Sequence, residues 1–411
     1  MSDLDVLVVG AGPVGMMAAL SLQRAGFAVE IVDEGQRRAG HSYAVGLHPR
    51  SVLLLERLGA LELLLPFAQR IDGVTLRGDG EERRLPLQGL PDSHDFGLAV
   101  PQSRLEEVLE KALRQRGVAV GWNQRLHQLD PDVDPPLAVV DVLRHDTSDS
   151  PFAEEPAAID RRRLLRPRLV IGADGHRSTV ARKLGIAAPN GGPARTFAAF
   201  EVRLPERACA RDLQLLLGRG TVDAVWPLRD GWSRCTFEVD AVPELDAAPR
   251  RKERTTWWIG SAEMRELFAR LWSERAPQLP MPTEVGWTGA ARFEHGLAAS
   301  WGRGRVWLLG DAAHLASPLA SHSLNRGFHE ADALATTLRS TAGGDAAAAL
   351  SAWAESSRRL WRQLAVAPVG GDDPWLAPYA EKLPAALPAT GAALRELLSR
   401  LLTRGALATT T

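Results

Sequence analysis

Three glycines near the start of the chain have the spacing of a phosphate-binding turn. Gly10, Gly12 and Gly15 follow the apolar run 6–9 and precede the stretch 16–25, which predicts a helix. The first glycine permits a tight turn, the second lets the backbone approach a phosphate, and the third lets the helix pack closely on the strand. The start of the helix adds unpaired amides and the positive end of a dipole. In this setting the glycines predict a dinucleotide site.

A carboxylate ends the next predicted strand. The run 28–32 stops at Asp33, with Glu34 beside it, about 20 residues beyond the glycines. A carboxylate at this place can accept hydrogen bonds from a ribose hydroxyl. The alternative is an ordinary strand–turn–helix with incidental glycines, but the strand, helix and acid in register favour dinucleotide binding.

Two later segments also place a carboxylate just after a short apolar run. They read Gly172-Ala173-Asp174-Gly175-His176-Arg177-Ser178 and Gly310-Asp311-Ala312-Ala313-His314, with Pro318 and Asn325 behind the second. An Asp-Gly pair after a strand is by itself an ordinary turn. The position of Asp174-Gly175 between the other two segments argues against reading this pair as an ordinary turn.

Together the three segments resemble the class A flavoprotein monooxygenases, the para-hydroxybenzoate hydroxylase family, over residues 5–339. The resemblance implies one FAD site built from three distant stretches, with NAD(P)H as a transient co-substrate. In the family, the Asp of the Gly-Asp pair hydrogen-bonds a ribityl hydroxyl, and the Asp-Gly segment touches both FAD and the reductant. The Pro and Asn that follow lie where the chain enters a helix under the isoalloxazine.

Two further stretches resemble the same family. Gln102 and Arg104 match residues beside the flavin, and 42–50 matches the stretch along the pyrophosphate. Tyr43 stands where the family usually has Arg, and Arg50 is either its substitute or a solvated arginine at a helix start. The resemblance thus implies cofactor contacts at Gly10, Gly12, Pro13, Gly15, Asp33, Glu34, Gln102, Arg104, Asp174, Gly175, Gly310, Asp311, Pro318, Ser323, Leu324 and Asn325.

The implied reaction is that of a single-component hydroxylase. No second glycine motif follows a predicted strand, whereas a two-dinucleotide reductase carries a separate NAD(P) domain. In the family, NAD(P)H reduces FAD, the reduced flavin adds O2 as a C4a-hydroperoxide, and its distal oxygen hydroxylates or epoxidises an aromatic or polycyclic small molecule. The expected catalytic contacts are Pro318, His322 and Trp226, the last at a strand end that faces the flavin.

The segment Ser321-His322-Ser323 departs from the family, most members of which have Gly-Gln-Gly. Glycines there let backbone amides lie against the flavin, and side chains normally obstruct such an approach. Serine is small and hydrogen-bonds, and histidine titrates near neutral pH. We expect a modified element that activates O2 or faces the substrate; lost activity is the alternative.

Phenol-hydroxylating members often use a tyrosine to accept the phenolic proton. Only Tyr43 and Tyr379 are present, and neither lies in the predicted second sheet. His295, His322 or a bound water is an alternative acceptor, although a lone histidine is more often structural. Trp226 is equally a core tryptophan or a pocket wall.

Composition indicates an ordinary globular enzyme. The chain has 411 residues, 45% of them hydrophobic and 24% charged, with a net charge of -1 that argues against nucleic acid or an anionic membrane as partner. Cys209 and Cys235 are too few for a disulfide framework and lack metal spacing. No apolar run reaches about 18 residues, and the first strand leaves no room for a signal peptide. We expect a cytoplasmic protein without a membrane span, and a homodimer is left open.

The expected fold is α/β, with a Rossmann-like FAD-binding domain, an inserted, mostly antiparallel β-sheet substrate domain and C-terminal helices. The segment 52–68 predicts a buried amphipathic helix, and 130–136 and 146–163 predict exposed hairpin loops. The predicted pieces are 1–72, 95–190 and 286–365 for the FAD domain, 73–94 and 191–285 for the substrate sheet, and 366–411 for the C-terminal helical segment.

Other classes share this fold: a flavin dehydrogenase, a halogenase, or a catalytically silent flavin-binding protein. A halogenase needs a catalytic lysine and a Trp-x-Trp-x-Ile-Pro box. The stretch Trp257-Trp258-Ile259-Gly260 matches the box poorly. Monooxygenase is therefore the favoured reading.

Overall fold

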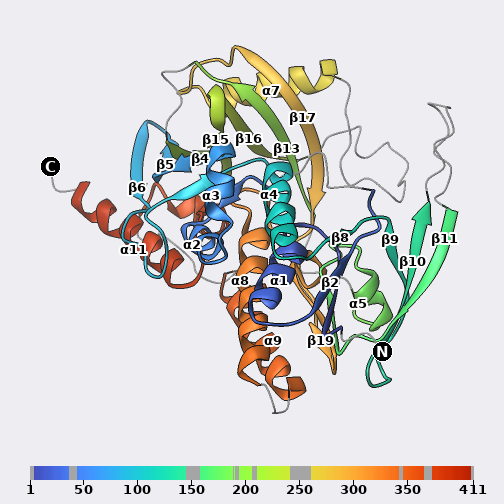
Figure 1. The fold of residues 1–411 in the computed structure, drawn as a ribbon. Coiled ribbons are helices and arrows are strands. Elements are labelled where there is room, and N and C mark those ends of the chain that lie inside the picture. Colours follow the sequence, from blue (N-terminus) through green and yellow to red (C-terminus); the bar gives the residue numbers. More distant parts are fainter. Residues whose placement is uncertain are drawn as a thin grey trace.

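The structure is a computed structural model that describes residues 4–36, 44–144, 158–187, 189, 194–205, 211–240, 261–341, 346–364 and 373–408. Tyr43, Cys209 and the tryptophan pair 257–258 lie outside these residues. Two large sheets dominate the fold (Figure 1). The fold is α/β, with a Rossmann-like parallel sheet, a largely antiparallel sheet and C-terminal helices, as the sequence predicts.

The first sheet has six strands, and its central strands are parallel. In spatial order they are β19 (Gly302–Arg303), β20 (Val306–Leu308), β12 (Leu169–Gly172), β1 (Val6–Val9), β2 (Val29–Val32) and β8 (Val120–Gly121). Every residue of β1 and β12 is buried, which explains why these strands are continuous apolar runs rather than alternating ones.

Helices cover this sheet. They are α1 (Pro13–Arg24), α4 (Gln102–Gln115), α8 (His322–Ser340), α9 (Ala346–Leu364) and the short α5 (Thr179–Lys183). Helix α1 packs against both α4 and α8, and α8 packs against α9. The one-sided apolar patterns of these helices place their leucines and alanines in a single core with β1, β2, β12 and β20.

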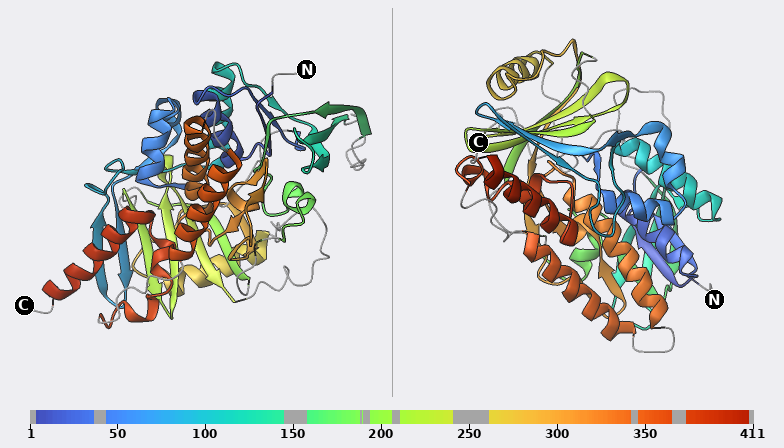
Figure 2. Two further views of the ribbon diagram at one scale, coloured as in Figure 1. Left: turned by 90° about the horizontal axis from the view of Figure 1, so that it is seen from below. Right: turned by 90° about the vertical axis from the view of Figure 1, so that its left-hand side faces the viewer.

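The second sheet has seven strands and packs between helices. In spatial order they are β17 (Glu284–Phe293), β13 (Arg195–Arg203), β16 (Trp232–Val239), β15 (Thr221–Pro227), β14 (Asp212–Gly218), β5 (Gly73–Gly78) and β6 (Glu81–Pro86). Only the β14–β5 pair is parallel. Figure 2 shows α7 (Ser261–Arg275) on one face and the C-terminal helices, α10 (Leu383–Ala386) and α11 (Gly391–Ala408), on the other. Strand β17 crosses the domain boundary predicted before residue 286.

Smaller sheets join these layers. The strands β9 (Gln124–Asp130), β10 (Leu137–Arg144) and β11 (Ala158–Leu165) form one; β3 (Gly46–Leu47), β7 (Gly97–Ala99) and β4 (Gln69–Ile71) form another; β18 (Gly296–Leu297) and β21 (His314–Leu315) form a pair. The remaining helices of the described residues are α2 (Pro49–Arg57), α3 (Leu61–Leu64) and four 3-10 turns at Leu65–Phe67, Arg229–Gly231, Gly310–Ala312 and Ala377–Tyr379.

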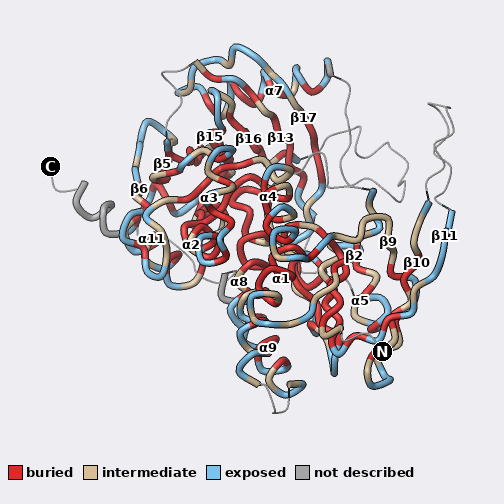
Figure 3. Tube along the Cα trace, in the orientation of Figure 1, coloured by how far each residue is buried: buried red, intermediate tan, exposed pale blue. Residues whose placement is uncertain are grey.

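Two sequence predictions need correction. The loop predicted over 146–163 is wrong for its last part, because residues from 158 onward form β11, which pairs with β10 and is almost entirely exposed (Figure 3). The single helix predicted over 52–68 is divided, because Gly59 has a φ of +67° that ends the first helix. The loop at 130–136 does connect β9 to β10. Within the described residues, no helix combines the length and apolarity that crossing a membrane requires.

Candidate functional site

The glycine turn lies between β1 and α1, as predicted. Gly10 has a φ of +102°, and a Cβ there would lie 2.3 Å from the carbonyl oxygen of Ala173. A Cβ on Gly15 would lie 1.9 Å from the carbonyl oxygen of Gly10. These two glycines are therefore required by packing within the protein.

Gly12 is different, because a Cβ there would meet no atom of the described residues within 4 Å. It is the residue before α1, whose first residue is the buried Pro13, and no side chain caps this helix start. The turn thus leaves open space beside the uncapped, positively polarised end of a helix. Space of this kind at a helix start is suited to a phosphate.

The strand order explains how distant motifs meet. Strands β20, β12, β1 and β2 are neighbours and parallel, so the loops after them leave the same edge of the sheet. Backbone hydrogen bonds tie these loops together, from Gly10 to Val32 (2.8 Å) and from Ala173 to Val9 (2.7 Å). The structure therefore brings the glycine turn, Asp33, Asp174 and Asp311 to one edge.

Asp33 braces the glycine turn. Its carboxylate accepts hydrogen bonds from the amides of Ala11 and Gly35, both at 2.7 Å. Each carboxylate oxygen can accept more than one hydrogen bond, so ribose recognition remains available to Asp33. The neighbouring Glu34 is exposed.

Asp174 caps helix α5. Its carboxylate accepts from the Ser178 hydroxyl (2.6 Å) and from the amides of Thr179 (2.7 Å) and Val180 (3.1 Å). Burial raises the pKa of Asp174, and these hydrogen bonds oppose the rise. The following Gly175 has a φ of +74° and open space where a Cβ would lie. A cofactor contact through Asp174 stays a prediction, since the protein itself already engages both oxygens.

Asp311 follows β20, and Gly310 before it has a φ of +59°. Burial raises the pKa of the Asp311 carboxyl group. The nearby His314 and His176 lower the same pKa and offset part of the rise. Many protein atoms thus lie close to the Asp311 carboxyl group, while part of the residue's surface still reaches solvent. Ser323 at the start of α8 hydrogen-bonds Asp311 and also accepts from the amide of Ala316 at 3.0 Å.

Side chains at the start of α8 are joined directly to the segment around β3. Asn325 is buried; its Oδ1 accepts from the amide of His48 (2.8 Å), and its Nδ2 donates to the carbonyls of Gly46 and Ser321 (both 2.9 Å). The hydroxyl of Ser321 accepts from the amides of Val45 and Gly46, both at 3.2 Å. Ser321 has a φ of +54°, a left-handed conformation that favours glycine. Asn325 therefore aligns two segments, and its contact with the cofactor stays a prediction.

His322 is buried at this helix start, and the expectation that it titrates near neutral pH is wrong. Burial and the positive charge of Arg326 lower its pKa to about 4, and the carbonyls of Pro384 and Leu387 offset only part of that effect. Its ring lies edge-on to His48, with 5.0 Å between ring centroids. His322 is therefore neutral at physiological pH and faces the C-terminal segment. His295, the other histidine considered, hydrogen-bonds the carbonyl of Leu315 at 3.0 Å.

Trp226 is packed rather than open to a cavity. It is 1% exposed, and its Nε1 donates to the carbonyl of Leu319 at 2.8 Å. Its ring lies so close to Gly46 that a Cβ there would be 2.5 Å from it. Of the two readings of Trp226, these contacts support the core tryptophan. Pro318 and Leu324, from the same loop and helix start, are also buried.

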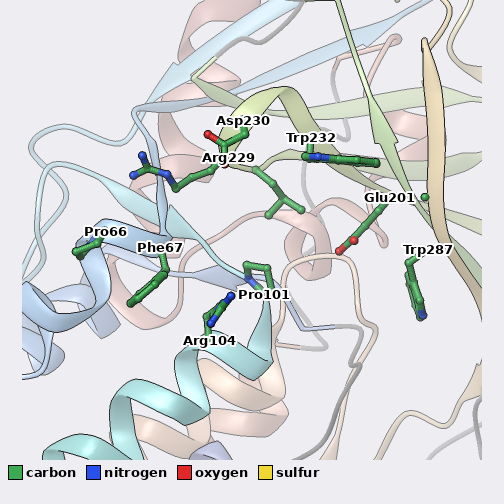
Figure 4. Close-up of a pocket in the computed structure, with 11 residues that line it drawn as sticks. Pro66, Phe67, Pro101, Arg104, Glu201, Arg229, Asp230, Trp232 and Trp287 are labelled. Atoms are coloured by element: carbon green, nitrogen blue, oxygen red, sulfur yellow. The ribbon is translucent and has the colours of Figure 1, made fainter.

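A pocket of about 340 Å³ lies between the start of α4 and the seven-stranded sheet (Figure 4). Its wall is formed by Pro66, Phe67, Pro101, Arg104, Glu201, Leu228, Arg229, Asp230, Trp232, Gly286 and Trp287. Gln102, the first residue of α4, hydrogen-bonds Glu106 at 2.7 Å. Arg50 lies elsewhere, with a guanidinium nitrogen 4.0 Å from the position of a Cβ on Gly391.

Sequence reasoning missed every residue of this pocket except Arg104. The wall comes from five separate segments, and no motif or spacing connects Phe67, Glu201, Trp232 and Trp287. The only sequence signal was the abundance of tryptophan, 12 residues beside 2 tyrosines, which indicates no position.

A family model described as an FAD binding domain matches residues 3–368. The chain is 29% identical over 350 residues to the 6-methylpretetramide 4-monooxygenase of Streptomyces rimosus, covering 83% of this chain and 57% of that protein. It is 27% identical over 357 residues to the para-nitrophenol 4-monooxygenase of Pseudomonas sp. strain WBC-3, covering 82% of this chain and 78% of that protein. The chain thus spans little more than half the length of the first relative.

Solved structures share the fold. The p-nitrophenol 4-monooxygenase of Pseudomonas putida DLL-E4 superposes with a TM-score of 0.72 at 22% identity, covering 98% of this chain and 95% of that chain. A ternary complex of aklavinone-11 hydroxylase with FAD and aklavinone gives a TM-score of 0.65 at 22% identity, covering 94% of this chain and 70% of that one.

Proposed function

Because the chain belongs to the family of FAD-dependent aromatic monooxygenases, we propose that it hydroxylates or epoxidises an aromatic or polycyclic small molecule as a single-component enzyme. NAD(P)H and O2 are its co-substrates. The observation that carries the proposal is the open space at Gly12, on the same sheet edge as the exposed Asp311.

The residues at this edge fit FAD. The space at Gly12 and the uncapped start of α1 suit the pyrophosphate, and Asp33 at the end of β2 suits the ribose of the adenosine half. Asp311 is an exposed carboxylate among buried neighbours, where it suits a ribityl hydroxyl. When bound, FAD supplies electron transfer between NAD(P)H and O2.

The chain's own residues organise the reaction site. Ser321 and Asn325 fix the start of α8 against the segment 45–48 through hydrogen bonds of 2.8–3.2 Å. Helix α8 then directs its uncapped, positively polarised end toward the loop that carries Pro318. The tryptophans and apolar side chains that surround this loop exclude water, which strengthens each electrostatic interaction there.

The test uses purified, FAD-loaded protein. NADH and NADPH are supplied separately with candidate phenols under labelled O2, and consumption of reductant and O2 is recorded together with the label in the product. We expect slow reductant oxidation without substrate, and one labelled atom in the product with substrate. Label found only in hydrogen peroxide or water, while a substrate nonetheless reacts, would favour the flavin dehydrogenase.

A further inference from the structure

The pocket between α4 and the seven-stranded sheet has walls suited to a flat ring system. Phe67, Trp232 and Trp287 reach it from three different segments. Phe67 is 38% exposed, so part of its ring is accessible to a ligand in the pocket. Aromatic walls with a few converging polar groups are typical of small-molecule sites.

Two charged side chains point into this pocket from opposite sides. Arg104 reaches it from α4 and Glu201 from the sheet, whereas the polar ends of Arg229 and Asp230 point away (Figure 4). Glu201 is held by Arg234, whose nitrogen donates to Oε1 at 2.5 Å and whose guanidinium lies 4.5 Å from the ring centre of Trp287.

Each charged group keeps bonding capacity for a ligand. Only Oε1 of Glu201 is engaged, so Oε2 has no partner among the described residues. Arg104 pairs with Glu107 at 2.9 Å, but both side chains are largely exposed, with 53% and 41% of their surfaces accessible. An exposed pair of this kind is worth little, so a ligand carboxylate can compete for the guanidinium.

We propose that this pocket selects a planar aromatic compound that carries a hydroxyl or amino group at one end and an anionic group at the other. The donor binds Glu201, the anionic group binds Arg104, and the rings lie among Phe67, Trp232 and Trp287. This inference rests on the proposed function and assigns Arg104 to the substrate instead of the cofactor. The pocket volume, about 340 Å³, is at the lower end for ligand sites, which favours two or three fused rings over four.

Calorimetric titration of the FAD-loaded protein, without NAD(P)H, tests each contact. The probes are 6-hydroxy-2-naphthoate, 6-methoxy-2-naphthoate, which lacks the donor, and 2-naphthol, which lacks the carboxylate. We expect the first to bind about tenfold more tightly than either of the others, because each lost contact involves a charged group. No measurable binding, or equal affinities for all three probes, would contradict the proposal.

Variants connect each preference to one residue. Glu201→Gln should reduce the preference for the hydroxyl probe over the methoxy probe, and Arg104→Gln should reduce the preference for the naphthoate over naphthol, each about fivefold or more. Matched controls are Glu284→Gln on β17 and Arg114→Gln on α4, whose side chains are 55% and 70% exposed and outside the pocket. Preferences that persist in both pocket variants overturn the assignment.

The two proposals fail separately, because binding is measured without turnover. Ligand preferences that are absent would contradict the pocket assignment alone. A protein that shows these preferences but transfers no labelled oxygen from O2 would contradict the proposed function alone.

Discussion

Gly12 and Gly15 lie three residues apart, but the surrounding protein requires glycine only at Gly15. At Gly15 the obstacle to a side chain is the protein's own backbone, 1.9 Å from the position of a Cβ. At Gly12 no atom of the described residues lies within 4 Å of the position of a Cβ, and φ is an ordinary -68°. Requirements set by folding and by the cofactor can thus be separated.

We expect Gly12→Val to give a folded protein that is largely free of FAD, because the new side chain fills the space that suits the pyrophosphate. Gly15→Ala should lower the free energy of unfolding by about 3 kcal/mol or more, since the backbone has to move. The measurements are flavin absorbance per protein and urea unfolding of the FAD-free forms. Stoichiometric FAD in Gly12→Val would show that the pyrophosphate is bound elsewhere.

His322 gives a second prediction at this scale. Its pKa is about 4 in the folded protein, below the ordinary value of 6.5, so the unfolded chain binds the extra proton more readily. Its contribution to stability is therefore complete above pH 6.5 and is lost as the pH falls toward 4, by at most about 1.4 kcal/mol per pH unit.

We expect His322→Gln to flatten the rise of unfolding free energy between pH 4 and 6.5 and to leave the region from pH 7 to 9 unchanged. Urea unfolding across this range measures both slopes. His48 and His329 have pKa values lowered in the same direction, so part of the rise should remain. Superimposable pH profiles of variant and parent would contradict the conclusion that the lowered pKa of His322 contributes to the loss of stability at low pH.

At the scale of elements, the junction of α8 with the segment 45–48 depends on one hydroxyl. Ser321 has a left-handed φ of +54°, and its Oγ is the acceptor for the amides of Val45 and Gly46. Any replacement that removes the hydroxyl leaves two buried donors unpaired, at about 1–3 kcal/mol each.

Ser321→Gly and Ser321→Ala separate the two effects of this residue. Both should destabilise the protein, but the alanine variant should be the less stable by roughly 1–2 kcal/mol, because only glycine adopts the left-handed conformation without strain. Urea unfolding of the two variants and the parent gives the order. An alanine variant as stable as the glycine variant would show that the backbone relaxes to another conformation.

The elements predicted best from sequence are those with a local signal. The short apolar runs 6–9, 169–171 and 306–309 predict strands, and the structure has strands at 6–9, 169–172 and 306–308, within one residue of the prediction at each end. The sequence does not indicate strand β11, because the strand is rich in arginine, is almost entirely exposed and lacks the alternation of apolar and polar residues that is typical of a strand. Ser321 was recognised as a departure, but its bonds to Val45 and Gly46 join residues more than 270 positions apart, which no local pattern indicates.

At the scale of the whole molecule, the C-terminal segment completes the core of the seven-stranded sheet. Leu397 of α11 is fully buried in the same cluster as Trp226 and Leu215. Arg400 of that helix donates to the carbonyls of Pro86, the last residue of β6, and of Gln88 and Gly89 behind it, at 2.8–3.1 Å. The sheet and the C-terminal helix therefore share one cooperative core.

We expect Leu397→Ala to lower the free energy of unfolding by about 2–5 kcal/mol, because it leaves a cavity in this core. Leu402→Ala, one turn further along α11 at a side that is 42% exposed, is the matched control and should change stability little. Urea unfolding followed by circular dichroism and by tryptophan fluorescence should give coincident transitions for both variants. A small effect of Leu397→Ala would show that the helix is dispensable for the sheet.

The strands that neighbour one another around β1 are far apart in the sequence, so they are synthesised at different times. On a ribosome, β1 and β2 emerge before β12, which pairs with β1 on its other side and comes at residues 169–172, and β20 follows at 306–308. Until then the far edge of β1 has no neighbour, and the wall that Ala173 provides behind Gly10 is missing. The glycine turn is therefore synthesised well before the segments that complete its surroundings. In that interval the nascent chain has an unpaired apolar strand edge, which chaperones are suited to cover.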